Sequence, residues 1–577
     1  MERASVLGSG VIAAAICVAV ASCGSEGRSA FSDPSATDPA SGGGGPGLGG
    51  LGANGCTKGG KTCVGNDIHE CGEDGGVGAF VKSCDDTGEF CMAGACGTGC
   101  DAAAGQPSNV GCEFWAVDLD NEYSSFNDAA GMPWGVVISN FGQVDANVTI
   151  EVNDAAPGQP TKLTTVTTKQ IGAGKLVEVE LPTREVDGST SADNGPGTML
   201  SSNAFRISSD RPVVVYQFNN MRHSYSNDAS LLVPTNGLGN VYRVLGWPTA
   251  NPITVGGLGV AGIPDHSFVT IVGTSSGTKV KVTLGGPIVG GGSVQATVKG
   301  GVVEATLGPF DVLNLESSGL PGDLTSTIVE SSAPVAVFTG GERGIAPLKD
   351  GPPPPPGYQQ SDLCCTDHLE EQLFPVTAGG KSFVITRSPI RSTGSYVEPD
   401  ILRFMGVAAT TTVKTSLPAP DDQFTLQPGE VRDTWTTKDI TVDATEPVMI
   451  GQIQVSQGFT DNPKYGGDPS LTIFPPIEQF RRDYLFNVPT SWEVDYVVIA
   501  AEVGSKVTID GADPQGCVVA SASAKYEARR CEITEGPHRM NGTAPFGIVA
   551  YGYGLHGSYA FVGGANVKKI YEPPPLK

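Results

Sequence analysis

Short apolar runs alternate with turn residues along most of the chain beyond Cys112. Val, Thr, Ile and Tyr recur in runs where apolar and polar positions alternate, and Gly, Asn, Asp and Pro separate these runs. Alternation with a period of two places one face of a β-strand against a core and leaves the other face in water. The pattern therefore predicts an all-β region over residues 112–577.

A repeat of domain length divides this region into four. Each copy has an apolar run, a short polar stretch and a proline that begins a second apolar run, and the prolines are Pro212, Pro334, Pro447 and Pro545. Proline has a fixed φ and no N–H, so it is tolerated at the first residue of a strand. We therefore predict a strand, a tight polar turn and a second strand at each of these places.

Each of the first three repeats also carries an acidic or polar patch, an apolar run and a proline, at 228–234, 368–375 and 468–475. A strand restarts after each proline, and we expect residues 114–123 to supply the equivalent strand of the first repeat. About six short strands per repeat fit a β-sandwich, whereas a propeller blade has about four strands in 40–50 residues. We expect four tandem β-sandwich-like modules, approximately at 112–245, 246–385, 386–490 and 491–570, with a propeller-like closed β array as the alternative.

The signatures at 228–234 and 364–375, together with 334–338 and 551–564, resemble the N-terminal domain of the IgGFc-binding protein family. The resemblance covers about residues 112–570. It implies a secreted, non-enzymatic recognition or adhesion region, and it does not imply that this chain binds antibody Fc.

The N-terminus predicts export and lipidation. Residues 6–20 form an apolar run behind Arg3 that is too short to cross a bilayer of about 30 Å, so we assign 1–22 as a signal peptide. Small residues directly before Cys23 predict a lipidated cysteine there, with an ordinary secretory signal as the alternative. Residues 23–55 are rich in Gly, Ser and Pro and predict a flexible linker. The expected location is the outer membrane or cell surface of a Gram-negative bacterium, with the lipid as the only membrane contact.

Cysteines define a small module at 56–111. An even number of cysteines in a short exported segment predicts disulfides, and zinc is the alternative. The pairing within this set is left open: Cys56, Cys63, Cys71, Cys84, Cys91, Cys96, Cys100 and Cys112. Farther along, Cys517 and Cys531 are expected to pair with each other. Cys364 and Cys365 are then left to pair with one another, or separately with other segments.

Composition excludes two classes of protein. With 79 Gly and 42 Pro, the chain has too many helix breakers for a helical bundle. With 36 basic and 61 acidic side chains, the net charge is −25, which repels polyanions, and no basic cluster offsets it. Nucleic acid is therefore not an expected partner. The expected partner is an extracellular protein or a neutral glycan.

Candidate chemistry is sparse. The chain contains no H-E-x-x-H motif, and no nucleophile elbow is expected. His368 and Glu370 would share one face of a strand with Glu371 on the other, which favours a structural, hydrogen-bonded loop over acid–base catalysis. Asp118, Asp120 and Glu122 are candidate Ca²⁺ ligands, with a solvated acidic edge strand as the alternative.

No other cofactor is expected. The predicted function is that of a surface-anchored lipoprotein with a non-catalytic binding region. The alternatives are an exported hydrolase on a β scaffold and a passive structural component of the envelope.

Overall fold

The structure is a computed structural model that describes residues 59–576 apart from short gaps. The gaps are 65–66, 73–75, 84–89, 93, 98, 105–107, 125–126, 141, 143, 187–196, 223–225, 250–253, 256–257, 260–264, 349–350, 358–364, 463 and 491. No helix in this described part is long and apolar enough to cross a membrane. The predicted signal peptide, Cys23 and the linker 23–55 lie outside the described residues.

The cysteine-rich segment forms small sheets around a minimal core. Ile68 is buried and packs against Cys63, Val81 and Cys96, and Cys71 and Ala103 are the other buried apolar residues in the described part of 59–104. So little apolar burial offsets only part of the cost of ordering the chain, which is why disulfides are needed here. Its elements are β1 (Lys61–Val64), β2 (Asp67–Cys71), β3 (Val77–Ser83), β4 (Phe90–Met92), β5 (Ala95–Gly97) and α1 (Gly99–Ala104).

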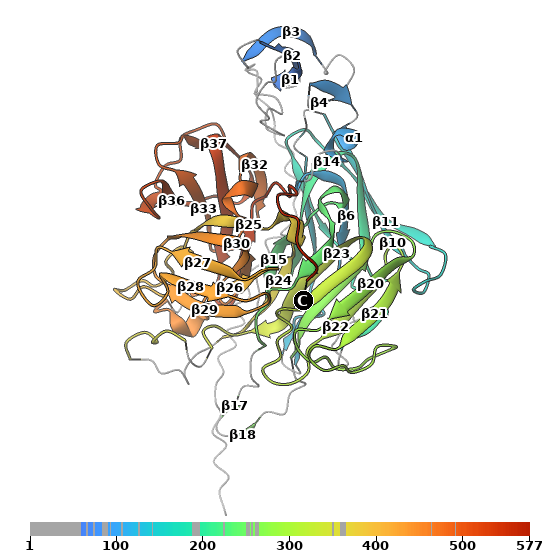
Figure 1. Ribbon diagram of the computed structural model, residues 1–577, viewed down its shortest axis with the longest axis vertical. Coiled ribbons are helices and arrows are strands. Elements are labelled where there is room, and N and C mark those ends of the chain that lie inside the picture. Colours follow the sequence, from blue (N-terminus) through green and yellow to red (C-terminus); the bar gives the residue numbers. More distant parts are fainter. Residues whose placement is uncertain are drawn as a thin grey trace, which may run out of the picture. The chain divides into compact units, whose positions relative to one another are not determined.

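Four large antiparallel sheets follow, one for each repeat (Figure 1). Module 1 contains β6 (Gly111–Ala116), β9 (Gly135–Asn140), β10 (Ala146–Asn153), β11 (Leu163–Ile171), β12 (Leu176–Glu180), β14 (Phe205–Asn219) and β15 (Asp228–Leu231). A small hairpin, β7 (Tyr123–Ser124) and β8 (Asn127–Asp128), lies outside its sheet. The prediction of an all-β region is confirmed.

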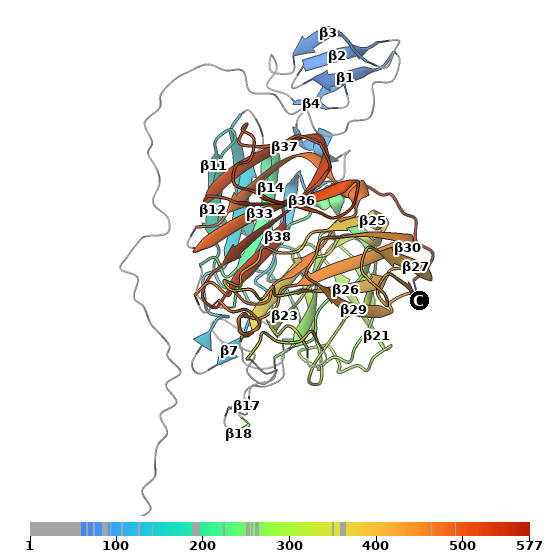
Figure 2. The same cartoon turned by 90° about the vertical axis from the view of Figure 1, so that its left-hand side faces the viewer.

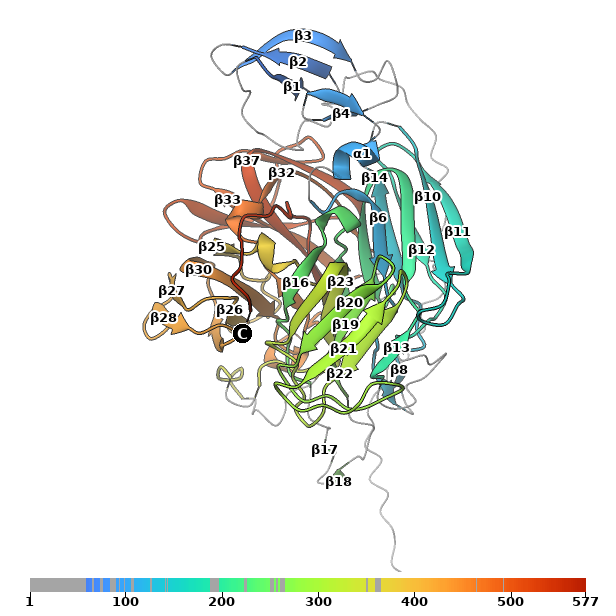
Figure 3. The same ribbon diagram turned by 45° about the vertical axis from the view of Figure 1, so that its right-hand side comes forward.

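Module 2 is the largest sheet, and Figure 3 shows its strands β16 and β19 to β23 in green to yellow-green. It contains β13 (Met199–Ser201), β16 (Gly239–Arg243), β19 (Ser267–Gly273), β20 (Thr278–Thr283), β21 (Val302–Leu307), β22 (Val312–Glu316), β23 (Ile328–Gly344) and β24 (Asp367–Gln372). A separate hairpin is formed by β17 (Thr254–Val255) and β18 (Leu258–Gly259).

Modules 3 and 4 repeat the same plan, and Figure 2 shows β33, β36, β37 and β38 of module 4 together. Module 3 contains β25 (Gly380–Ile385), β26 (Asp400–Gly406), β27 (Thr411–Thr415), β28 (Gln423–Leu426), β29 (Val431–Thr436), β30 (Ile440–Ile453) and β31 (Leu471–Ile473). Module 4 contains β32 (Arg481–Val488), β33 (Val494–Glu502), β34 (Val507–Ile509), β35 (Val518–Ser521), β36 (Tyr526–Glu532), β37 (Gly536–Tyr553) and β38 (Ser558–Val562).

One long strand joins the two layers of each module. The first half of β14 pairs with β6 and β10, and its second half pairs with β9 and β15. β23, β30 and β37 divide in the same way between two sets of partners. Both layers of module 1 contribute to one buried apolar cluster, as a β-sandwich requires. The sandwich-like module is therefore confirmed.

The predicted turn before each repeat proline is wrong, because the strand continues through it. Pro212 lies between the part of β14 that pairs with β10 and the part that pairs with β9. Pro334, Pro447 and Pro545 occupy the same place in β23, β30 and β37. At this crossing the long strand passes from one set of partner strands to the other. The N–H that proline lacks is therefore not needed for an inter-strand hydrogen bond.

The sheets divide the chain earlier than the predicted boundaries at 245/246, 385/386 and 490/491. β25 and β32 each begin the sheet that follows, just after a short 3₁₀ turn. β16 has the equivalent place in module 2, whose sheet also takes β13 from within the sequence of module 1. These turns are η2 (Thr235–Gly237), η4 (Val376–Ala378) and η6 (Ile477–Gln479), whereas η5 (Gln457–Phe459) lies within a loop of module 3. β6 pairs with β14 as β16 pairs with β23, so it fills in module 1 the place of these post-proline strands.

The four modules close into a ring because each shares a buried apolar cluster with the next. Phe268 of module 2 packs in the cluster of module 1, and Met405 of module 3 packs in that of module 2. A third cluster combines Tyr216 of module 1, Phe404 of module 3 and Tyr551 of module 4. The protein therefore combines sandwich-like modules with the closed arrangement that was the predicted alternative.

Candidate functional site

Four equivalent strands meet at the centre of the ring: β15, β24, β31 and β38. Each pairs on one side with the long strand of its module and turns its other edge inward. Such an inner edge carries backbone N–H groups that no ladder satisfies, and buried N–H groups need acceptors. Acidic side chains provide them.

Asp228 is the central acceptor. Its carboxylate accepts the N–H of Ala229 at 3.0 Å and those of Glu370 and Leu471 at 3.1 Å each. The N–H of Ala560 also donates to it. These four donors come one from each module, at the equivalent position of each inner strand. A single buried side chain thus joins the whole ring.

Two further carboxylates continue this column. Asp367 accepts the N–H groups of Asn227 at 2.6 Å, His368 at 3.1 Å and Ser558 at 3.1 Å. Glu371 accepts the N–H of Ile473 at 3.2 Å and the hydroxyl of Ser230 at 3.2 Å. The acidic patches of the second sequence signature are therefore backbone acceptors between modules.

Burial raises the pKa of every carboxyl in this column. Desolvation is the largest cause for Asp228, Asp367, Glu370 and Glu371, while backbone or side-chain donors oppose it and neighbouring carboxylates add to it. Burial raises the pKa of Asp468 to about 7. We therefore expect the carboxyls at the centre of the ring to lose their protons at a higher pH than exposed carboxyls do.

His368 and Glu370 do share a face of β24, as alternation predicts. His368 Nε2 lies 3.6 Å from Glu370 Oε2, and Glu371 binds elsewhere. Both side chains of the pair are completely buried, and His368 stacks on Phe268. Burial lowers the pKa of His368 to about 3, so the imidazole is neutral. The segment is a strand and not the expected loop.

The candidate Ca²⁺ ligands are buried and bind separate partners. Asp118 accepts the N–H of Arg184 at 2.7 Å, and Glu122 pairs with Arg343 at 3.3 Å. Asp118, Asp120 and Glu122 are each at most 8% exposed. The alternative of a solvated acidic edge strand therefore does not hold for this segment.

The structure joins Cys517 to Cys531, as predicted, and Cys100 to Cys112. Cys63, Cys71, Cys96 and Cys365 are disulfide-bonded as well, whereas Cys56, Cys84 and Cys364 lie outside the described residues, and only the backbone of Cys91 is described.

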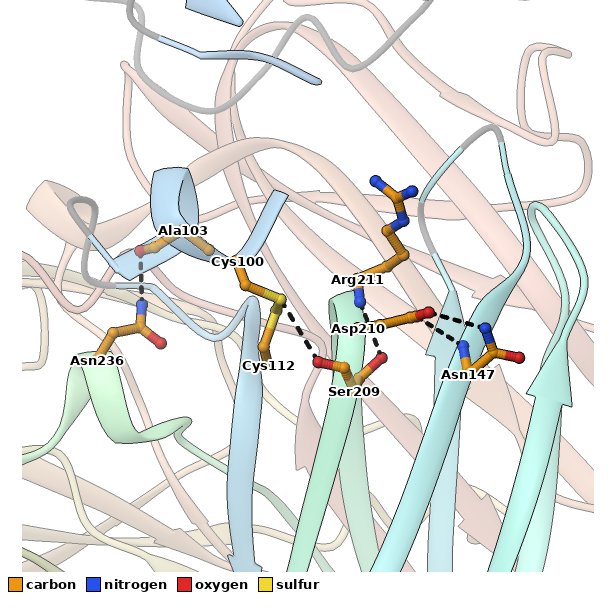
Figure 4. The surroundings of a disulfide bond; sticks show 8 residues. All are labelled: Cys100, Ala103, Cys112, Asn147, Ser209, Asp210, Arg211 and Asn236. Carbon is orange, nitrogen blue, oxygen red and sulfur yellow. Dashed lines mark hydrogen bonds between the residues drawn. A yellow bond between two sulfur atoms is a disulfide. The ribbon is translucent and has the colours of Figure 1, made fainter. Parts of the chain in front are cut away.

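The Cys100–Cys112 bond fixes the cysteine-rich segment to module 1 (Figure 4). It lies against the crossing of β14, where the N–H of Arg211 donates to the Ser209 hydroxyl at 3.3 Å. Asn236, in the turn that ends module 1, donates to the carbonyl of Ala103 in α1 at 3.0 Å.

The β35–β36 ribbon in module 4 has an exposed edge that the sequence patterns did not reveal. Among the described strands, β35 forms the outer edge of its sheet and pairs with β36. Val518 and Val519 are 67% and 57% exposed. Because neighbouring strand residues face opposite sides, both faces of β35 are open to solvent, whereas Tyr526, Ala528 and Cys531 of β36 are buried. An open groove of about 780 Å³ lies beside it, lined by Lys506, Arg529 and other residues.

Two comparisons with known proteins bear on function. No curated protein matches the chain. The sequence model of the IgGFc binding protein family matches residues 228–552, which is more than half of the chain. The match begins at Asp228, the central acceptor of the ring, and ends within β37. The resemblance expected from the short signatures is confirmed, and the chain belongs to the IgGFc binding protein family.

Proposed function

We propose that this chain is a non-catalytic binding protein, displayed at the cell surface by a lipid on Cys23, that recognises an extracellular protein through module 4. Membership of a family of binding proteins is the observation that carries the proposal. Family membership supports protein binding in general.

The buried histidines favour binding over hydrolysis. A general acid or base must reach the substrate. His368 is completely buried, and both ring nitrogens of His538 are engaged, by Asp510 at 2.8 Å and by the Thr534 carbonyl at 2.6 Å. Neither of these two imidazoles is therefore placed to contact a substrate.

The β35–β36 ribbon has the features of a protein-binding edge. An exposed strand edge can add a strand from a partner, and main-chain hydrogen bonds then supply affinity while side chains supply specificity. Natural proteins protect such edges with charges, prolines or coverage. β35 instead presents two adjacent valines, and the Cys517–Cys531 bond holds it against β36. The exposed edge is thus apolar at Val518 and Val519 and is tied covalently to β36.

Replacing Val518 and Val519 together by serine should weaken binding about 10- to 100-fold, because each valine loses apolar burial in the complex. Both side chains are exposed, so the fold should be retained. Binding would be measured by surface plasmon resonance against purified IgG Fc, a panel of secreted proteins and an array of neutral glycans. Val298→Ser, 73% exposed in module 2, is the matched control.

Equal binding by the Val518/Val519 variant and the control would reject the ribbon as the binding surface. Binding confined to neutral glycans would reject the protein partner. If no probe bound, the passive envelope component would be favoured, and turnover of any probe by the full chain would identify a hydrolase.

Cys23→Ser should move the protein from the membrane fraction to the soluble exported fraction. A single buried acyl chain is marginal, so stable anchoring needs the several chains that a lipidated N-terminal cysteine carries. Fractionation after feeding radiolabelled palmitate would measure this, with Cys17→Ser in the signal segment as the control. Label on the Cys23→Ser protein, or no label on the parent, would exclude lipidation at this residue.

A further inference from the structure

Three buried side chains meet at one end of module 2, on three neighbouring strands. His266 directly precedes β19, Glu316 ends β22 and Glu342 lies in β23. They are 5%, 0% and 2% exposed. One imidazole nitrogen and one oxygen from each carboxylate lie within 4.8 Å of one another. The ligand atoms are thus spaced closely enough to surround one ion.

Strand register produces this cluster. Phe268 of β19 lies opposite Glu316 of β22, and Ser267 lies opposite Gly341 of β23. The next position pairs His266 with Glu342, and the N–H of Glu342 donates to the His266 carbonyl at 3.0 Å. His266 lies two residues before Phe268, so the two side chains face the same side of the sheet. Glu316 lies opposite Phe268 and therefore faces that side as well. The backbone therefore holds all three groups in place.

The imidazole of His266 makes the hydrogen bond that fixes the tautomer of many metal-binding histidines. Its Nδ1 lies 2.6 Å from the Ser317 carbonyl oxygen, which can only accept, so Nδ1 carries the proton. Nε2 is then left with a lone pair. A carbonyl that fixes the tautomer in this way is the usual outer partner of a metal-binding histidine.

Hydrogen bonds position both carboxylates of the cluster: Asn314 Nδ2 donates to Glu316 at 3.2 Å, and the N–H of His266 donates to Glu342 at 2.9 Å. Two buried carboxylates are costly unless they are paired. Arg343, next along β23, has its guanidinium bound by Asp265 and lies 3.3 Å from Glu122. Its single positive charge is therefore divided among Asp265, Glu122 and Glu342. A divalent ion beside Glu316 and Glu342 would be attracted by both carboxylates.

We propose that His266, Glu316 and Glu342 bind a divalent transition-metal ion of the Zn²⁺ or Mn²⁺ class. An imidazole with two carboxylates suits such ions, whereas Ca²⁺ prefers oxygen ligands alone. The site is structural, because its ligands are buried and join β19, β22 and β23. It also fixes the segment before β13, since the N–H of Gly197 donates to Glu316 at 2.5 Å. This proposal is independent of the partner-binding surface.

Cobalt titration of the full chain tests the site. After removal of metal with EDTA, Co²⁺ should produce visible absorption bands and raise the melting temperature, and Zn²⁺ should displace it. His266→Gln and Glu316→Gln should weaken Co²⁺ binding at least tenfold. His538→Gln, a substitution of another buried histidine in module 4, should leave it unchanged. Bands that persist in both site variants would overturn the proposal.

A measurement on the parent protein does not depend on whether the variants fold. X-ray absorption of the Zn²⁺-loaded chain should give a shell of nitrogen and oxygen atoms with a single imidazole. A sulfur ligand, two or more imidazoles, or no retained metal and no change in melting temperature with Co²⁺, Zn²⁺ or Mn²⁺ would refute it.

Discussion

Asp228→Ala should lower the free energy of unfolding by about 3–6 kcal/mol. The substitution leaves four buried N–H groups, one from each module, without their acceptor. An unsatisfied buried donor costs about 1–3 kcal/mol. Loss of the repulsion between Asp228 and the carboxylates of Glu370 and Glu371 offsets part of this cost. Urea denaturation followed by tryptophan fluorescence would measure the change.

Asp443→Ala is the matched control. Asp443 lies exposed in β30 and accepts one hydrogen bond, from the Ser382 hydroxyl at 2.8 Å. We expect it to change stability by less than about 1 kcal/mol. The parent should unfold in one transition because the inner strands are joined through Asp228, whereas the Asp228→Ala protein should show separate transitions. Similar stability of the two variants would show that the central carboxylate does not hold the ring together.

Local patterns predict the modules because the repeat is encoded in neighbouring residues. Alternating runs indicated the strands, and Pro212 and its counterparts marked equivalent points. The polar residues before Pro212 resemble a turn, yet β14 continues through them. Whether such a stretch turns or crosses between layers depends on β9 and β10, which pair with its two halves. That information is absent from the segment itself.

The contacts at the centre of the ring cannot be predicted from any local segment of the sequence. Asp228 was visible as part of an acidic signature, but two of its donors, Glu370 and Leu471, lie 142 and 243 residues away. The fourth inner strand, β38, lacks both the acidic residue and the proline of the others. His266, Glu316 and Glu342 are likewise joined only by strand register. Sequence spacing could therefore identify repeats and not the contacts between them.

Stability should fall by about 2–5 kcal/mol between pH 5 and pH 8. Burial raises the pKa of Asp468 and of Asp495 to about 7, whereas in the unfolded chain an aspartate titrates near 4. The folded protein therefore binds more protons than the unfolded chain between these values. The stabilisation is complete below about pH 4 and is lost as pH rises through about 7. Urea denaturation at a series of pH values would record it.

Asp495→Asn should flatten this pH dependence and raise stability at pH 8 by about 1–3 kcal/mol. Desolvation is the main cause of its raised pKa, and Glu535 and Glu493 add to it. The Tyr559 hydroxyl donates to Asp495 Oδ1 at 2.8 Å, and an asparagine oxygen can accept the same bond. The substitution thus removes the charge and keeps the contact. Asp443→Asn, at an exposed position, is the control and should leave the pH profile unchanged. If the Asp495→Asn protein kept the pH profile of the parent, the Asp495 carboxyl would be ionised in the folded protein without cost.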